Sequence, residues 1–86
     1  MRTIIEPHTL KRALERGASE NEILEVMEKG SSIKAKNDRF SKELVFDFKN
    51  IWNDKYYEQK KIEVIYTIED DLIITITVYV FYGKWE

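Results

Sequence analysis

Residues 61–82 read KIEVIYTIEDDLIITITVYVFY, and this stretch decides the fold. Apolar side chains alternate with polar ones on both sides of Asp70-Asp71, which is the pattern of two β-strands joined by a turn. A two-residue turn at Asp70-Asp71 would pair Ile68 with Ile73 and mix apolar with polar partners. A three-residue loop that includes Leu72 pairs Ile68 with Ile74 and gathers the aliphatic side chains on one face, so we expect that loop.

This register divides the hairpin into two faces. The aliphatic face carries Ile62, Val64, Tyr66, Ile68, Ile74, Ile76, Val78 and Val80. The opposite face carries Glu63, Ile65, Thr67, Thr75, Thr77, Tyr79 and Phe81. An antiparallel sheet tolerates one face in water, and we expect any ligand to bind on that face.

Weaker strand signals come earlier in the chain. Thr3-Ile4-Ile5 predicts a short edge strand, residues 32–36 a second strand, and residues 43–49 a third, with a turn at Asn37-Asp38. Residues 50–60 show no clear period, so we expect a loop or an irregular hairpin tip there.

Two helices are predicted in the N-terminal third of the chain. The first covers residues 8–16 and ends at Gly17, which suits a left-handed C-terminal cap. The second follows a capping box formed by Ser19 and Glu22 and continues to about Lys29. The expected fold is therefore a single α+β domain over residues 1–86, with two N-terminal helices packed on one face of a three- to four-stranded antiparallel sheet.

The composition excludes several classes of site. A chain of 86 residues with 43% hydrophobic content supports one thin core. It has no cysteine and one histidine, so we expect no disulfide, no metal and no cofactor. Because no apolar run approaches the roughly 20 residues of a membrane span and no signal peptide is recognisable, we expect a cytoplasmic protein with no membrane partner.

The charge is unevenly distributed. The net charge of −2 weighs against nucleic-acid binding. Residues 34–61, however, hold eight Lys or Arg against five Asp or Glu, whereas residues 62–86 hold one against five. The basic segment is either ordinary scatter on a small surface or a lobe that faces a polyanion.

The clearest candidates for chemistry lie at four-residue spacing. His8, Arg12 and Arg16 share one face of the first predicted helix. In a metal-free ribonuclease, His8 would serve as general acid or base, and the two arginines would hold phosphate oxygens. The same pattern also fits a solvent-facing histidine and arginines in surface ion pairs, which contribute little to stability.

Two segments carry a family resemblance. EPHTLKRALERGASENEILEVMEKG (residues 6–30) and IEVIYTIEDDLIITITVYVFYGKWE (residues 62–86) resemble the opening and the closing hairpin of a broad bacterial family of uncharacterised small proteins. That family more distantly resembles the RelE-like and BrnT-like toxins of toxin–antitoxin systems, which are small ribonucleases without metal. The resemblance implies a RelE-like fold, an RNA substrate and an antitoxin partner, and it matches Tyr79 to the tyrosine of the last strand.

These observations predict one site and leave several functions open. The expected catalytic residues are His8, Arg12, Arg16 and Tyr79, and the expected substrate-binding residues are Tyr82, Lys84 and Trp85. The leading hypothesis is an endoribonuclease toxin. The alternatives are a non-enzymatic module that binds a protein or forms a homodimer through the open sheet face or edge, and a toxin homologue that has lost its activity.

Overall fold

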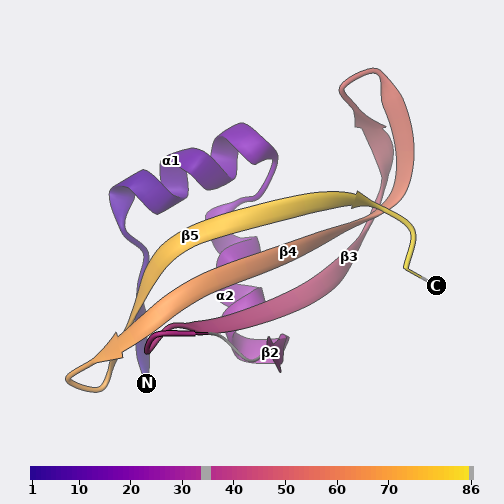
Figure 1. Ribbon diagram of the computed structural model, residues 1–86. Coiled ribbons are helices and arrows are strands. Elements are labelled where there is room, and N and C mark those ends of the chain that lie inside the picture. The colour runs from indigo at the N-terminus through magenta and orange to yellow at the C-terminus, as the bar shows by residue number, and fades with distance from the viewer. Residues whose placement is uncertain (34–35, 86) are drawn as a thin grey trace.

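The computed structural model describes residues 1–33 and 36–85. Within that part of the chain lie two helices, and five strands form one sheet in the order β1-β5-β4-β3-β2 (Figure 1). The helices are α1 (Pro7–Arg16) and α2 (Glu20–Lys29), and the strands are β1 (Arg2–Ile4), β2 (Ser31–Ile33), β3 (Phe40–Trp52), β4 (Lys55–Glu69) and β5 (Leu72–Gly83).

The sheet is mixed, which corrects the expected three- to four-stranded antiparallel sheet with RelE-like helix packing. β1 pairs with β5 in parallel, with Arg2 opposite Leu72, while the other neighbouring strands are antiparallel. α1 packs along β5, and α2 packs against β3 and β4. The α+β class is confirmed. The antiparallel prediction is wrong for β1, because a strand of three residues carries no sequence signal for the direction of its partner.

Residues 50–60 form an irregular hairpin tip, which is one of the two expected alternatives. The other alternative, a loop, is excluded because β3 and β4 continue through this segment, with a register shift between Asp47 and Asn50, and pair until Trp52 lies opposite Lys55. Asn53 and Asp54 alone form the turn, with φ values of 51° and 67°. Asn and Asp adopt positive φ more readily than other side chains, and positive φ at both positions is typical of the tight turns that suit twisted hairpins.

The β4–β5 hairpin also has a two-residue turn rather than the expected three-residue loop. Glu69 lies opposite Leu72 and Ile68 opposite Ile73, and Asp70 and Asp71 have φ values of 49° and 63°. The expected pairing of Val64 with Val78 is nevertheless present. The two-residue turn and the expected pairing of Val64 with Val78 occur together because β5 contains one extra residue between the turn and Val78.

That extra residue is Ile76, at a β-bulge. Ile65 pairs with Thr77 and Tyr66 with Thr75, so Ile76 has no counterpart in β4. The bulge turns Thr75 toward the helices, where it is 1% exposed and its Oγ1 accepts a hydrogen bond of 3.1 Å from the backbone N–H of Glu6. The expected positions of Thr75 and Ile74 are thus exchanged between the two faces.

The helix ends confirm the sequence reading. Gly17 has φ of 92° and caps α1, and its neighbour Ala18 donates its N–H to the carbonyl of Ala13. Ser19 and Glu22 form the predicted capping box at the start of α2. The expected strand at residues 32–36 is Ser31–Ile33 in the structure, and its positions 34–35 lie outside the described residues.

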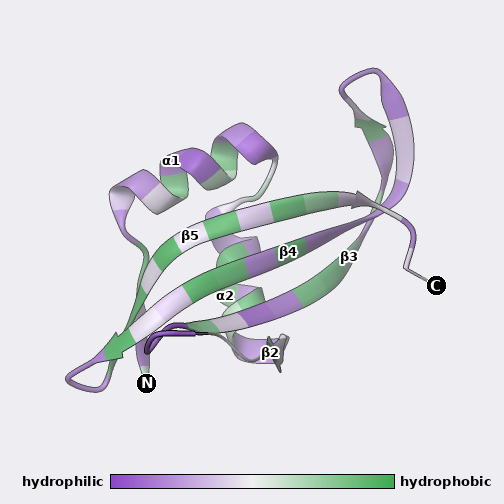
Figure 2. Ribbon diagram, viewed as in Figure 1, coloured by the Kyte–Doolittle hydropathy of each residue, from purple (hydrophilic) through white to green (hydrophobic). Residues whose placement is uncertain are grey.

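The core lies between the helices and one face of the sheet. Its members are Ala13, Ala18, Ile23, Val26, Met27, Ile62, Val64, Tyr66 and Val78. Figure 2 shows alternating bands of hydropathy along the long strands, as expected for strands with one buried face. The helices cover this face only, so the opposite face of β3, β4 and β5 is where a ligand has access.

Candidate functional site

The face of the sheet turned away from the helices, called the open face below, carries the candidate site. It displays Ser41, Glu43 and Val45 from β3, Lys61, Glu63 and Ile65 from β4, and Thr77, Tyr79 and Phe81 from β5. Tyr79 is the predicted catalytic tyrosine and is 44% exposed. The alternation of β4 and β5 alone places it correctly on this face.

A pocket of about 560 Å³ opens beside Tyr79. The segment between β2 and β3 contributes Lys36, Asn37 and Arg39 to its wall, and the sheet contributes Ile65, Thr77 and Tyr79. Because this pocket is lined by two cations, Lys36 and Arg39, and by the phenol of Tyr79, it suits an anionic ligand with an aromatic part.

Arg16 reaches the same region from α1. Its Nη1 donates a hydrogen bond of 2.6 Å to the carbonyl of Val78, and its guanidinium carbon lies 5.6 Å from the centre of the Tyr79 ring. A guanidinium at this distance is attracted to the ring face. The structure therefore brings together two of the four predicted catalytic residues, Arg16 and Tyr79.

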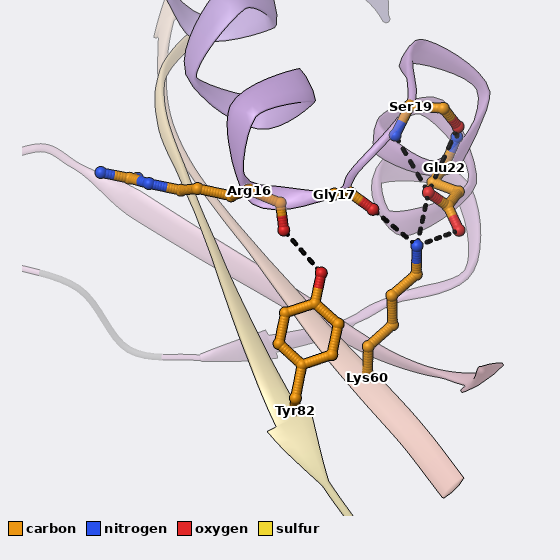
Figure 3. Close-up of polar contacts among 6 residues, drawn as sticks. All are labelled: Arg16, Gly17, Ser19, Glu22, Lys60 and Tyr82. Carbon is orange, nitrogen blue, oxygen red and sulfur yellow. Dashed lines mark hydrogen bonds and ion pairs between the residues drawn. The ribbon is translucent and has the colours of Figure 1, made fainter. Parts of the chain in front are cut away.

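The end of α1 is fixed from the helix-covered side of the sheet (Figure 3). The Tyr82 hydroxyl donates a 2.6 Å hydrogen bond to the carbonyl of Arg16, and Lys60 Nζ donates one of 2.7 Å to the carbonyl of Gly17. Lys60 also lies 2.9 Å from a carboxylate oxygen of Glu22. These contacts hold the backbone from which the Arg16 side chain extends.

Tyr82, predicted to bind substrate, belongs to this structural cluster. Its ring stacks on Trp52, with centroids 4.9 Å apart, and contacts the rings of Phe48 and Tyr57. Burial, with a smaller contribution from the charge of Glu22, raises the pKa of Tyr82 to about 12. The phenol therefore stays protonated near neutral pH and keeps its hydrogen bond to Arg16.

A carboxylate lies next to Tyr79. Glu63 is the direct cross-strand partner of Tyr79, and Ser41 Oγ donates a 2.7 Å hydrogen bond to Glu63 Oε2. Directly opposed side chains have Cβ atoms about 4.5–5.5 Å apart. A general base beside a phenol and a guanidinium is a workable set for proton transfer at a phosphate.

The other two predicted catalytic residues lie farther along α1. His8 and Arg12 are exposed. His8 precedes Arg16 by eight residues, which is about 12 Å along the helix axis. The four-residue spacing correctly predicts a shared helix, but only the last member of the series contacts Tyr79.

The two predicted binding residues near the C-terminus are both exposed. The backbone N–H of Trp85 donates a 2.7 Å hydrogen bond to Gln59 Oε1, and Lys61 Nζ lies 5.3 Å from the centre of the Trp85 ring. A second pocket of about 300 Å³ is formed there by Ser31, Glu43, Leu44, Val45, Lys61 and Trp85. No contact of Lys84 is part of this arrangement.

The basic segment 34–61 does not form one lobe. Lys42 Nζ donates a 2.8 Å hydrogen bond to the carbonyl of Met27 at the end of α2, much as Lys60 does at the end of α1. Cations at helix C-termini satisfy free carbonyls and complement the helix dipole. Among the cations of described residues 36–61, Lys36, Arg39 and Lys61 line the two pockets of the open face, whereas Lys42 and Lys60 bond to helix ends.

Sequence reasoning did not predict Lys36, Arg39 and Ser41 as members of this site. Their only signal is their position in a basic segment next to a predicted turn. Within residues 1–33 and 36–85, no three His, Asp or Glu side chains lie close enough to hold a metal ion. In the same described part, neither helix has the length and apolar character needed to cross a bilayer.

Residues 5–80 match the family model of a domain of unknown function, DUF4258. The chain belongs to this family. The match includes both helices and most of the sheet of the DUF4258 domain, which confirms the resemblance to an uncharacterised family. Neither the curated proteins nor the solved structures include a significant match to it. The bacterial origin and the relation to RelE-like and BrnT-like toxins gain no support from these comparisons.

Proposed function

We propose that this DUF4258 domain is a metal-independent endoribonuclease that acts as the toxin of a toxin–antitoxin system. The observation that carries the proposal is the position of Tyr79, which contacts Arg16 and lines a pocket together with Lys36 and Arg39. Glu63 is the cross-strand partner of Tyr79, so a carboxylate lies next to the same phenol. An antitoxin protein that covers this face would block the site.

The chemistry needs two proton transfers and one stabilised charge. The RNA 2′-oxygen attacks the adjacent phosphorus and loses its proton to Glu63. The bond from phosphorus to the 5′-oxygen breaks, and Tyr79 supplies a proton to that oxygen. The products are a 2′,3′-cyclic phosphate and a free 5′-hydroxyl.

Cations would stabilise the negative charge that builds up on the phosphorane. Arg16 is held in place by its hydrogen bond to Val78, so it needs little reorganisation during the reaction. Arg39 and Lys36 would bind the non-bridging oxygens from the opposite wall of the pocket. This assignment moves the general base from His8 to Glu63, because Glu63 is the cross-strand partner of Tyr79, whereas His8 precedes Arg16 by about 12 Å along the helix axis. His8 and Arg12 would then contact flanking phosphates.

The test is cleavage of an end-labelled single-stranded RNA by the purified protein in the presence of a chelator. We expect Glu63→Gln and Tyr79→Phe each to lower kcat by about 10²–10⁴-fold, the usual contribution of one general acid or base. Tyr56→Phe is the matched control, since Tyr56 is exposed near the Asn53–Asp54 turn and lies outside the site.

Two results would contradict the proposal. The first is a folded wild-type protein that leaves RNA intact, which would favour the non-enzymatic binding module. The second is cleavage that persists unchanged in both Glu63→Gln and Tyr79→Phe. If cleavage is lost only in His8→Ala, the general base is His8 of α1 rather than Glu63.

A further inference from the structure

Two exposed aromatic side chains of β5, Tyr79 and Phe81, and the ring of Trp85 just beyond the end of that strand form a row on the open face, called the aromatic stripe below. Tyr79 and Phe81 are alternate residues of the strand, with ring centroids 6.5 Å apart. Trp85 continues the series because its ring lies against Gly83, the next position on this face. Between 39% and 45% of each residue is exposed, so all three rings offer surface to a ligand.

Each ring of the stripe has a cation beside it. Arg16 lies 5.6 Å from the centre of the Tyr79 ring, and Lys61 Nζ lies 5.5 Å from the centre of Phe81 and 5.3 Å from that of Trp85. Lys61 also forms an ion pair with Glu43 at 3.3 Å, and Glu63 lies opposite Tyr79 on the same face. The stripe therefore combines stacking surface with a cation beside each ring.

Both ends of the stripe adjoin a hollow. The pocket of about 560 Å³ lies beside Tyr79, and the pocket of about 300 Å³ lies beside Trp85. Phe81 lies between them. A ligand that used both pockets would have to cross the aromatic stripe.

We propose that the aromatic stripe binds the bases of single-stranded RNA. The inference rests on the proposed function and names the form of its substrate. Aromatic rings with neighbouring cations are the usual surface for single strands, because bases stack on the rings and the cations meet the phosphates. The 6.5 Å between Tyr79 and Phe81 exceeds the about 3.4 Å rise of stacked bases, so a strand must be splayed to use both. A duplex keeps its bases paired and cannot do so.

The experiment measures binding without cleavage. The probe is a short fluorescent oligodeoxyuridylate, which presents bases and phosphates but lacks the 2′-hydroxyl needed for cleavage. We expect Phe81→Ala and Trp85→Ala each to weaken its binding roughly tenfold, as measured by anisotropy. Tyr56→Ala, an exposed tyrosine outside the stripe, should bind like the wild type, and a duplex of oligodeoxyuridylate with oligodeoxyadenylate should bind more weakly than the single strand.

Several outcomes would overturn the proposal. They are an absence of binding, equal affinity in folded Phe81→Ala and Trp85→Ala, and equal affinity for the duplex. A dimer in gel filtration that dissociates in both variants would assign the stripe to a second copy of the chain instead. Circular dichroism spectra and thermal melts of each variant keep misfolding apart from lost binding.

The outcomes also separate this inference from the proposed function. RNA cleavage by the wild type, with unchanged oligodeoxyuridylate affinity in Phe81→Ala and Trp85→Ala, would support the nuclease function and contradict base binding by the stripe. Tight binding of oligodeoxyuridylate through the stripe, with no cleavage of RNA, would support base binding by the stripe and contradict the nuclease function.

Discussion

The two faces of the sheet use the same residue types for opposite purposes. Lys60 and Lys61 are neighbours on β4 and point to opposite faces. Lys60 is 6% exposed and bonds to Gly17 and Glu22, whereas Lys61 lies at the surface over two aromatic rings. Tyr82 and Tyr79 differ in the same way, because the first bonds to backbone and the second faces the pocket. Burial thus decides which cation or phenol is structural.

The largest effect should come from Lys60. Lys60→Met removes a cation from the half-buried carbonyl of Gly17 and leaves Glu22 without this partner, so we expect a loss of about 2–3 kcal/mol in the free energy of unfolding. Lys61→Met removes a more exposed ion pair and should cost less than about 1 kcal/mol. Urea denaturation measures both values, and similar losses for the two variants would refute the difference between the faces.

Gly17, on the helix-covered side, and Gly83, on the open face, allow the two faces to be compared through substitutions at glycine. Gly17 has positive φ, and a Cβ there would collide with the Tyr82 hydroxyl and crowd the Trp52 ring, so Gly17→Ala should destabilise the protein by about 2 kcal/mol. At Gly83 a Cβ would meet the Trp85 ring at an ordinary 3.5 Å. Gly83→Ala should therefore change the thermal midpoint little, and a loss as large as that of Gly17→Ala would contradict the prediction.

Removing one hydroxyl from each face should have a smaller effect. Tyr82→Phe leaves the carbonyl of Arg16 without its donor and should cost about 1 kcal/mol in unfolding free energy. Tyr79→Phe should leave stability within about 0.5 kcal/mol of the wild type, since surface substitutions usually do. Chemical denaturation of both variants under the same buffer checks the order, and a larger loss in Tyr79→Phe would reverse the assignment.

The dependence of the unfolding free energy on alkaline pH tests the contribution of Tyr82. Its pKa rises from 10.0 to about 12 on folding, so the protonated phenol contributes stability that is complete below pH 10 and is lost as the pH rises toward 12. Wild-type protein should lose unfolding free energy over that interval more steeply than Tyr82→Phe. Tyr66, whose pKa burial also raises, is present in both proteins and cancels in the comparison. Parallel curves would show that Tyr82 does not titrate in this way.

Local signals explain what the sequence predicted well. Gly17, Ser19 and Glu22 fix the helix boundaries because each acts on its own backbone neighbours. Alternation in β4 correctly assigned Ile62 and Val64 to the core. Such signals involve residues a few positions apart, and little else in the fold can override them.

Long-range geometry explains the features that the sequence did not predict. The bulge at Ile76 exchanges the faces of Ile74 and Thr75, and simple alternation cannot include an extra residue. The sequence did not decide between a loop and a hairpin tip for residues 50–60, because the aromatic side chains of this segment pack on Tyr82, which lies far away in sequence. For the candidate site, helix periodicity placed His8, Arg12 and Arg16 on one helix but could not show that, of these three, Arg16 bonds to β5 and contacts Tyr79.

The pairing of the first elements with the last one has a consequence for synthesis on the ribosome. Within this domain β1 and α1 are synthesised before the other elements, yet both pack on β5, the last of its strands. The bonds from Thr9 to Ile76 and from Arg16 to Val78 span more than 60 residues. The apolar side of α1 therefore stays uncovered until β5 has left the exit tunnel, so the domain should complete its folding only after β5 has emerged.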